Sequence, residues 1–173
     1  MRQIQRRAGI TAVFVTHDQA EALAMADLVA VMNAGRIEQL GTPETVFERP
    51  STPFVARFVG RSARFEATLK GGRAHVAGAA LRGDDLPSAG RADIYVRPHR
   101  IRLLAQDASE DNVLDGLIVS LDYTGEVMQV MVETGAGRVP VDVGTFDNAW
   151  RNLRVGQAVR LGWRAADTLS FPI

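Results

Sequence analysis

The sequence contains no cysteine. Disulfide bonds, thiolate metal sites and thiol nucleophiles are therefore excluded, and a reducing compartment such as the cytosol is the expected location. Lysine is almost absent as well, because Lys70 is the only lysine among the 20 basic residues. Any site that needs a lysine elsewhere in the chain is therefore excluded.

Net charge and long apolar runs are also missing. The 20 Lys and Arg residues balance 20 Asp and Glu residues, so no overall field draws the chain to nucleic acid or anionic lipid. No apolar run approaches the about 20 residues that cross a bilayer, and we expect no direct membrane insertion. Aromatic residues make up only 6% of the chain, which disfavours a barrel that stacks the bases of single-stranded nucleic acid.

The N-terminal part carries the signals of an α/β domain. Met1–Ala8 reads as the end of a polar helix, and the apolar run Thr11–Val15 is typical of a strand buried on both faces of a parallel sheet. Asp18 and Glu21 have the spacing of a capping box at the start of a helix. We therefore expect His17 to lie between a strand end and a helix start, where ligands bind in open α/β sheets.

A hairpin and two short helices are expected next. The apolar segments Leu28–Met32 and Ile37–Leu40 are joined by a turn in which Gly35 needs a positive φ. Thr42-Pro43 and Thr52-Pro53 each place an N-cap threonine before a proline at the first helical position. The sequence therefore predicts two helix starts ten residues apart.

After Gly60 the chain changes to short apolar segments broken by Gly, Asp and Pro. Their brevity and spacing predict a small antiparallel barrel or sandwich. We therefore expect a boundary after residue 60, with one domain in residues 1–60 and a β domain in residues 61–173. The predicted strands are Phe65–Leu69, Ile94–Val96, Leu117–Leu121, Val127–Val132, Arg138–Val143 and Val159–Trp163.

Two segments carry a resemblance to a known family. The segment 15–60, which contains Thr16-His17-Asp18-Gln19 and Gly35-Arg36-Ile37, closely resembles the last part of the nucleotide-binding domain of ABC-importer ATPases. The run Val96-Arg97-Pro98-His99-Arg100-Ile101-Arg102-Leu103 is similar to the hallmark of the transport-associated OB-type (TOBE) domain. The fold implied is α+β, with an α/β remnant of an ABC ATPase domain followed by an all-β, OB-like barrel.

The resemblance implies that His17 is the switch histidine, which bonds the γ-phosphate of ATP in that family. The P-loop, the Leu-Ser-Gly-Gly-Gln signature and the strand ending in Asp-Glu are not found in this sequence. Because phosphoryl transfer depends on positioning and charge stabilisation by those parts, we expect the chain to bind no cofactor and to turn over no ATP. ATP and magnesium are expected only in a full-length parent, which the resemblance implies is a transport ATPase.

Arg97, Arg100 and Arg102 are candidates for an anion pocket, since guanidinium groups make bidentate contacts to oxyanions. Alternation along a strand would place Arg100 and Arg102 on one face. The other interpretation is a solvated strand edge that charge protects from aggregation. A metal site is not expected, because His75 and His99 belong to different predicted strands.

The function implied is that of the C-terminal regulatory or dimerisation portion of an importer ATPase subunit. The expected partners are a second copy and, for the full-length parent, transmembrane permease subunits that hold it at the inner face of the cell membrane. Two alternatives stay open: a module that senses a small molecule or oxyanion, and, more weakly, a nucleic-acid-binding OB module. Because the expected strand Thr11–Val15 lacks parallel neighbours, the sequence also predicts that the first third of the chain pairs with another copy, exchanges strands with it or is disordered, whereas the barrel folds regardless.

Overall fold

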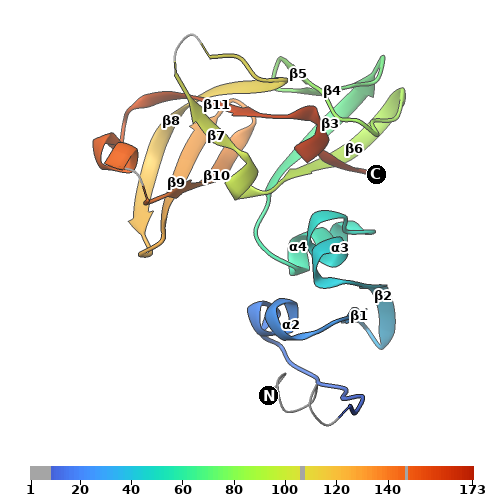
Figure 1. Cartoon of the computed structure of the whole chain (residues 1–173). Helices are drawn as coiled ribbons and strands as arrows, with labels where there is room; N and C mark the ends of the chain where they lie inside the picture. Colours follow the sequence, from blue (N-terminus) through green and yellow to red (C-terminus); the bar gives the residue numbers. More distant parts are fainter. Residues whose placement is uncertain (1–8, 106–107, 147) are drawn as a thin grey trace. The chain divides into compact units, whose positions relative to one another are not determined.

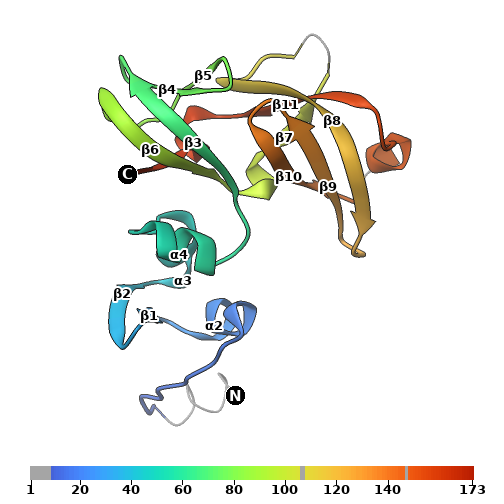
Figure 2. The same cartoon turned by 180° about the vertical axis from the view of Figure 1, so that it is seen from behind.

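The computed structural model describes residues 9–105, 108–146 and 148–173. The chain divides into two compact units, one up to Gly60 and one from Arg61 to Ile173. Figures 1 and 2 show the first as a small group of helices with one hairpin and the second as a body of strands. The helix expected over Met1–Ala8 lies outside the described residues.

The N-terminal unit forms its elements where local side chains favour them. Thr42 and Thr52 accept hydrogen bonds from the backbone N–H groups three residues later, each at 3.2 Å, and a proline follows each of them. The hairpin turn has positive φ at Ala34 (47°) and Gly35 (78°), the conformation of a type I′ turn. The elements are α2 (Gln19–Met25), β1 (Val29–Asn33), β2 (Arg36–Gly41), α3 (Pro43–Glu48) and α4 (Pro53–Phe58).

The core of this unit is small. It consists of four buried valines, with Leu23, Val29, Phe47 and Phe54 packed against them. One face of the hairpin contributes to it, while Met32 and Ile37, which pair across β1 and β2, are 58% and 60% exposed. The buried valines are Val31, Val46, Val55 and Val59.

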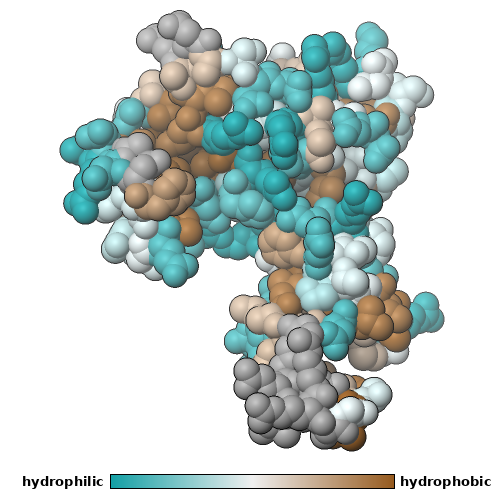
Figure 3. Space-filling view, in the orientation of Figure 1, coloured by the Kyte–Doolittle hydropathy of each residue, from teal (hydrophilic) through white to brown (hydrophobic). Residues whose placement is uncertain are grey.

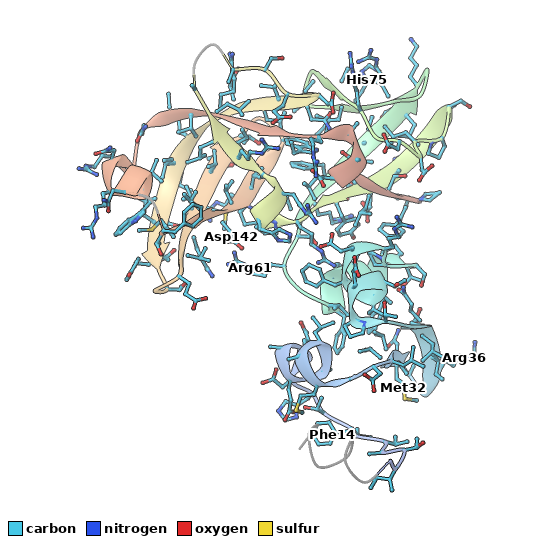
Figure 4. All side chains as sticks on the ribbon, viewed as in Figure 1. Phe14, Met32, Arg36, Arg61, His75 and Asp142 are labelled. Carbon is cyan, nitrogen blue, oxygen red and sulfur yellow. The ribbon has the colours of Figure 1, made fainter. Side chains whose placement is uncertain are left out.

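The strand expected over Thr11–Val15 is absent, and that prediction is wrong for this chain. The segment has no regular structure, and Val13, Phe14 and Val15 are 92%, 52% and 90% exposed. A strand of a parallel sheet needs neighbours to pair its backbone groups and to cover both faces. No other described strand pairs with this segment, and Figure 4 shows Phe14 lying outside the body of the unit.

The C-terminal unit consists of two antiparallel five-stranded sheets. Their strand orders are β10-β9-β8-β11-β7 and β12-β6-β3-β4-β5. The hairpins β3-β4 and β9-β10 turn at Gly71-Gly72 and Gly135-Ala136. The strands are β3 (Ala63–Lys70), β4 (Arg73–Val76), β5 (Ala79–Leu81), β6 (Ala89–Val96), β7 (Arg102–Leu104), β8 (Asn112–Tyr123), β9 (Val127–Thr134), β10 (Gly137–Gly144), β11 (Ala158–Trp163) and β12 (Leu169–Pro172).

Both sheets contribute to one hydrophobic core. Along β9 the side chains of Met128, Val130 and Val132 are buried and those between them are not, so one face packs on the core and the other is wet. Trp163 on β11 is fully buried and stacks on Phe65 of β3 with ring centroids 6.0 Å apart. The six strands predicted from the sequence are all present, and the fold class is the one expected.

Candidate functional site

His17 lies in a bend just before α2, and its backbone neighbours are held by side chains. Asp18 caps α2 by accepting from the N–H of Glu21 at 3.0 Å. The Thr16 hydroxyl accepts from the N–H of Asp18 at 3.0 Å and donates to the Glu21 carboxylate at 2.8 Å. The residues on both sides of His17 are therefore fixed, while its own side chain is exposed.

A further contact reaches from this helix to the end of the N-terminal unit. Gln19, the first residue of α2, accepts through Oε1 a hydrogen bond of 3.1 Å from the N–H of Gly60. Gln19 was not among the site residues predicted from the sequence. The one local signal was its position directly after His17-Asp18, and the partner lies 41 residues away.

The three candidate arginines do not converge on one pocket. The buried Arg97 donates through Nη1 to the Ser62 hydroxyl at 2.9 Å and to the Arg61 carbonyl at 3.2 Å. Nε of Arg100 lies 3.8 Å from Asp167, and Arg102 pairs with Glu110 at 3.0 Å. Each guanidinium group is therefore held by a different segment of the chain.

The alternation expected for Arg100 and Arg102 along one strand is wrong. Pro98–Arg100 forms a 3-10 turn, with Arg100 N–H bonded to the Arg97 carbonyl at 2.9 Å, and β7 begins only at Arg102. Proline fixes φ near the helical value and has no N–H for a strand ladder. The two arginines consequently lie on different elements.

Asp167 lies between two arginines. It accepts two hydrogen bonds from Arg164, at 3.0 and 3.3 Å, and also faces Arg100. The hydrogen bond to Asp167 raises the pKa of Arg164 above its ordinary value. Arg64 of β3 donates a hydrogen bond of 2.7 Å to Asp93 of β6, and this bond raises the pKa of Arg64 in the same way. Arginine is charged at every physiological pH, so both guanidinium groups carry their charge whenever these pairs form.

Apolar side chains gather around a groove of about 460 Å³ beside β7 and β11. Leu103 and Leu104 of β7 line it, together with Val159 of β11 and Leu153. Figure 3 shows this apolar area on the face of the C-terminal unit. The groove also includes the ion pair between Arg160 and Asp115, at 2.8 Å.

The two tryptophan side chains both make contacts within the chain. The ring of Trp150 stacks on Tyr123 at 5.2 Å, and the Arg151 guanidinium lies 4.7 Å from the Trp150 ring centroid. Trp163 is enclosed in the core, where its Nε1 donates to Thr168. Both tryptophan rings are therefore already occupied by contacts within the chain.

Two absences hold for residues 9–105, 108–146 and 148–173, which the structure describes. No group of three or more His, Asp or Glu side chains there is arranged to hold a metal ion. No helix in those ranges has the length and apolar content of a bilayer-spanning segment.

Comparisons with known proteins agree with this architecture. A family model described as the TOBE domain matches residues 94–171. The spermidine/putrescine import ATP-binding protein PotA of Acidothermus cellulolyticus is 42% identical over 144 residues, which cover 78% of this chain and 38% of that protein. The sulfate/thiosulfate import ATP-binding protein CysA of Brucella melitensis is 37% identical over 145 residues, covering 83% of this chain and 39% of that protein.

The chain belongs to the ATP-binding subunits of ABC importers. It corresponds to their C-terminal part and spans about two fifths of the length of these two relatives.

The TOBE domain of this importer chain also has a structural neighbour. The cytoplasmic molybdate-binding protein ModG superposes with a TM-score of 0.55 and 15% sequence identity, covering 66% of this chain and 97% of ModG. At that identity the likeness concerns the fold. It supports the OB-like assignment of the strands that follow the importer chain's helical unit.

Proposed function

We propose that this importer chain is the regulatory and dimerisation portion of a transport ATPase subunit. In the complete subunit, ATP and magnesium would energise solute uptake through membrane permease subunits at the inner face of the cell membrane. The relatives supply this context, because their names describe import ATP-binding proteins. One name refers to cationic polyamines and the other to anionic sulfate, so the names do not select a solute.

The proposal of dimerisation rests on an apolar surface of the TOBE domain. Leu117, Val119 and Val155 are 51%, 39% and 63% exposed. Backbone hydrogen bonds join Ile118 to Gly156 and Gln157, at 2.8 and 3.0 Å, so Val155 lies beside the outer part of β8. A second copy is the occupant we propose, because in a two-fold contact an apolar patch can cover an identical patch.

We propose the role of switch histidine for His17 only in the complete subunit. The bend that holds it is fixed on both sides, and its side chain is free to face a ligand. The exposed Val13-Phe14-Val15 segment just before it is consistent with a strand that the rest of a nucleotide-binding domain would cover. We expect the chain alone to show no ATP turnover, and a measured rate that disappears in His17→Ala would contradict this.

The dimer is tested by sedimentation of the full chain over a range of concentrations. We expect a dimer for the unchanged chain, and we expect Leu117→Glu to shift it to monomer, because a charge in the centre of an apolar contact stays desolvated and unpaired. Because Leu117 is exposed on the outer face of β8, its replacement should leave the hydrophobic core intact. Circular dichroism checks that the variant folds.

Lys70→Glu is the matched control, since it changes charge at an exposed position at the end of β3. It should leave the dimer intact. A monomeric unchanged chain, or a dimer that Leu117→Glu leaves unaltered, would exclude the proposed surface.

The sensing alternative is not favoured by the three arginines, because each is held by separate groups. Calorimetry of the full chain against sulfate, molybdate, phosphate and spermidine decides it directly. Saturable binding of one of these would make ligand sensing the better assignment. The nucleic-acid alternative is disfavoured by the occupied rings of Trp150 and Trp163.

A further inference from the structure

One end of the sheet β12-β6-β3-β4-β5 carries basic residues side by side. Lys70, the last residue of β3, and Arg73, the first residue of β4, are Cα partners in the hairpin register. The register of β4 with β5 runs as far as Ala74 and Leu81, and one position further it places Arg82 beside Arg73. Three cationic residues therefore form one row across neighbouring segments of the sheet.

The side chains of this row lie on the outer face of the sheet. Each of the three is exposed and adjoins a buried core residue, the neighbours being Leu69, Ala74 and Leu81. Alternation along the strands therefore turns the basic side chains away from the core. His75, two positions along β4 from Arg73, is exposed on the same face, and Figure 4 shows it pointing away from the body of strands. The backbone of Arg82 is fixed, because the buried Asn112 bonds its N–H and carbonyl groups at 2.6 and 3.0 Å.

The row differs from the other basic residues of the TOBE domain in its lack of acidic partners. Among the described residues, no carboxylate forms an ion pair with Lys70, Arg73 or Arg82. Most other arginines of the domain face a carboxylate, including the pairs Arg64–Asp93, Arg91–Glu66, Arg102–Glu110, Arg138–Glu133 and Arg160–Asp115. Like charges directly opposite each other destabilise a sheet, so the row does not help the chain to fold.

Protection of a sheet edge does not explain the row either. Charged side chains on an edge strand prevent unwanted pairing with other chains. However, β3 pairs with both β4 and β6, and β4 pairs with both β3 and β5. Lys70 and Arg73 therefore belong to strands that already have a neighbour on each side.

We propose that Lys70, Arg73 and Arg82 form a docking surface for an extended acidic segment of a partner protein. Neighbouring strands lie about 4.8 Å apart, and carboxylates on one face of an extended chain repeat about every 7 Å. The long side chains of lysine and arginine can follow that repeat, and each guanidinium group can hold a carboxylate through two hydrogen bonds. The partner supplies the negative charges that the row lacks within this chain.

Other anionic partners fit this surface less well. A small anion needs donors that converge in a hollow, whereas this row lies on an exposed sheet face outside the groove beside β7 and β11. A nucleic acid is attracted by a strong overall field, and the chain has no net charge. The acidic segment remains the occupant that the local charge favours.

The first test is a titration of the full chain with an octaglutamate peptide, followed by NMR. We expect the backbone amide resonances of Lys70, Arg73 and Arg82 to shift until saturation, and added salt to weaken the binding. Lys70→Gln and Arg73→Gln together should weaken it about 2- to 30-fold, the combined effect of losing two exposed charge pairs. Resonances of the row that do not respond to the peptide would overturn the proposal.

The matched control removes two charges elsewhere on the same domain. Arg138→Gln and Arg160→Gln together change the net charge by the same amount, but both arginines already pair with carboxylates, at 3.0 and 2.8 Å. Peptide binding should stay close to that of the unchanged chain. Equal weakening by the two double variants would show that only net charge matters and would exclude a site at the row.

A measurement without peptide tests the electrostatic argument itself. Lys70→Gln relieves the repulsion of Arg73 and should leave the melting temperature unchanged or raise it. A fall of several degrees would show that Lys70 stabilises the free chain, and would count against the proposal.

Two further probes identify the partner class. A single-stranded oligonucleotide and phosphatidylserine vesicles carry the same charge without being peptides. Tighter binding of either one through the row would replace the acidic segment by that partner. These measurements use neither ATP nor the Leu117 surface, so their failure would leave the proposed dimerisation standing.

Discussion

At the scale of single residues, Thr168 accepts hydrogen bonds from two buried donors in the TOBE core. Its hydroxyl oxygen accepts from Trp163 Nε1 at 3.1 Å and from Asn112 Nδ2 at 3.2 Å. The buried Asn112 also bonds both backbone groups of Arg82, at 2.6 and 3.0 Å. One hydroxyl therefore satisfies two buried donors and supports the link between β8 and the segment after β5. Buried polar groups without partners are costly.

We expect Thr168→Val to lower the free energy of unfolding of the C-terminal unit by about 1–3 kcal/mol, because valine keeps the shape but leaves two buried donors without this acceptor. Urea denaturation followed by Trp163 fluorescence measures the loss. Thr168→Ser retains the hydroxyl and should lose clearly less. If serine and valine cost the same, the missing methyl group or general packing, and not the hydroxyl, would be responsible.

Among helices, turns and strands, those that depend on neighbouring residues follow the sequence, and one that depends on distant strands does not. The helix starts at Asp18, Thr42 and Thr52 follow the sequence because a cap needs a side-chain oxygen and an N–H only three residues away. The turn at Gly35 follows the sequence as well, because it too depends only on neighbouring residues. The strand expected over Thr11–Val15 fails because its hydrogen bonds must come from other strands, and no described strand pairs with it.

The arginine segment shows the limit of a periodic pattern. The run Arg100-Ile101-Arg102-Leu103 alternates polar and apolar residues, yet its first residue belongs to the 3-10 turn Pro98–Arg100. Alternation predicts facing only where the backbone stays extended. The short strands β4, β5, β7 and β12 were not predicted either, because three or four residues are too few to show a period.

At the scale of the molecule, the two units have very different cores. The N-terminal core is built on four buried valines, whereas the TOBE core buries Phe65, Trp163 and aliphatic side chains from both sheets. Hydrophobic stabilisation grows with the apolar area removed from water. The smaller unit should therefore open more easily.

We expect native-state hydrogen exchange to show this as two levels of protection. Amides of the β1-β2 hairpin and of α3 and α4 should exchange through openings that require much less free energy than those of β3, β8 and β9. The measurement is exchange of the full chain at increasing, sub-denaturing urea concentrations. A single opening energy for both units would show instead that the chain unfolds as one cooperative body.

The sequence by itself determined the helix starts, the hairpin turns, the six longer strands and the resemblance that led to the importer family, because these features depend on neighbouring residues or on long ordered motifs. The helix start just after His17 was predicted in the same way, while the role of His17 as the switch histidine stays a prediction. Only the tertiary structure decided that Arg97, Arg100 and Arg102 are held by different groups, that no described strand pairs with Thr11–Val15, and that Gln19 holds Gly60. Each of these depends on contacts between residues distant in the chain, and a periodic pattern carries no information about which distant groups will meet.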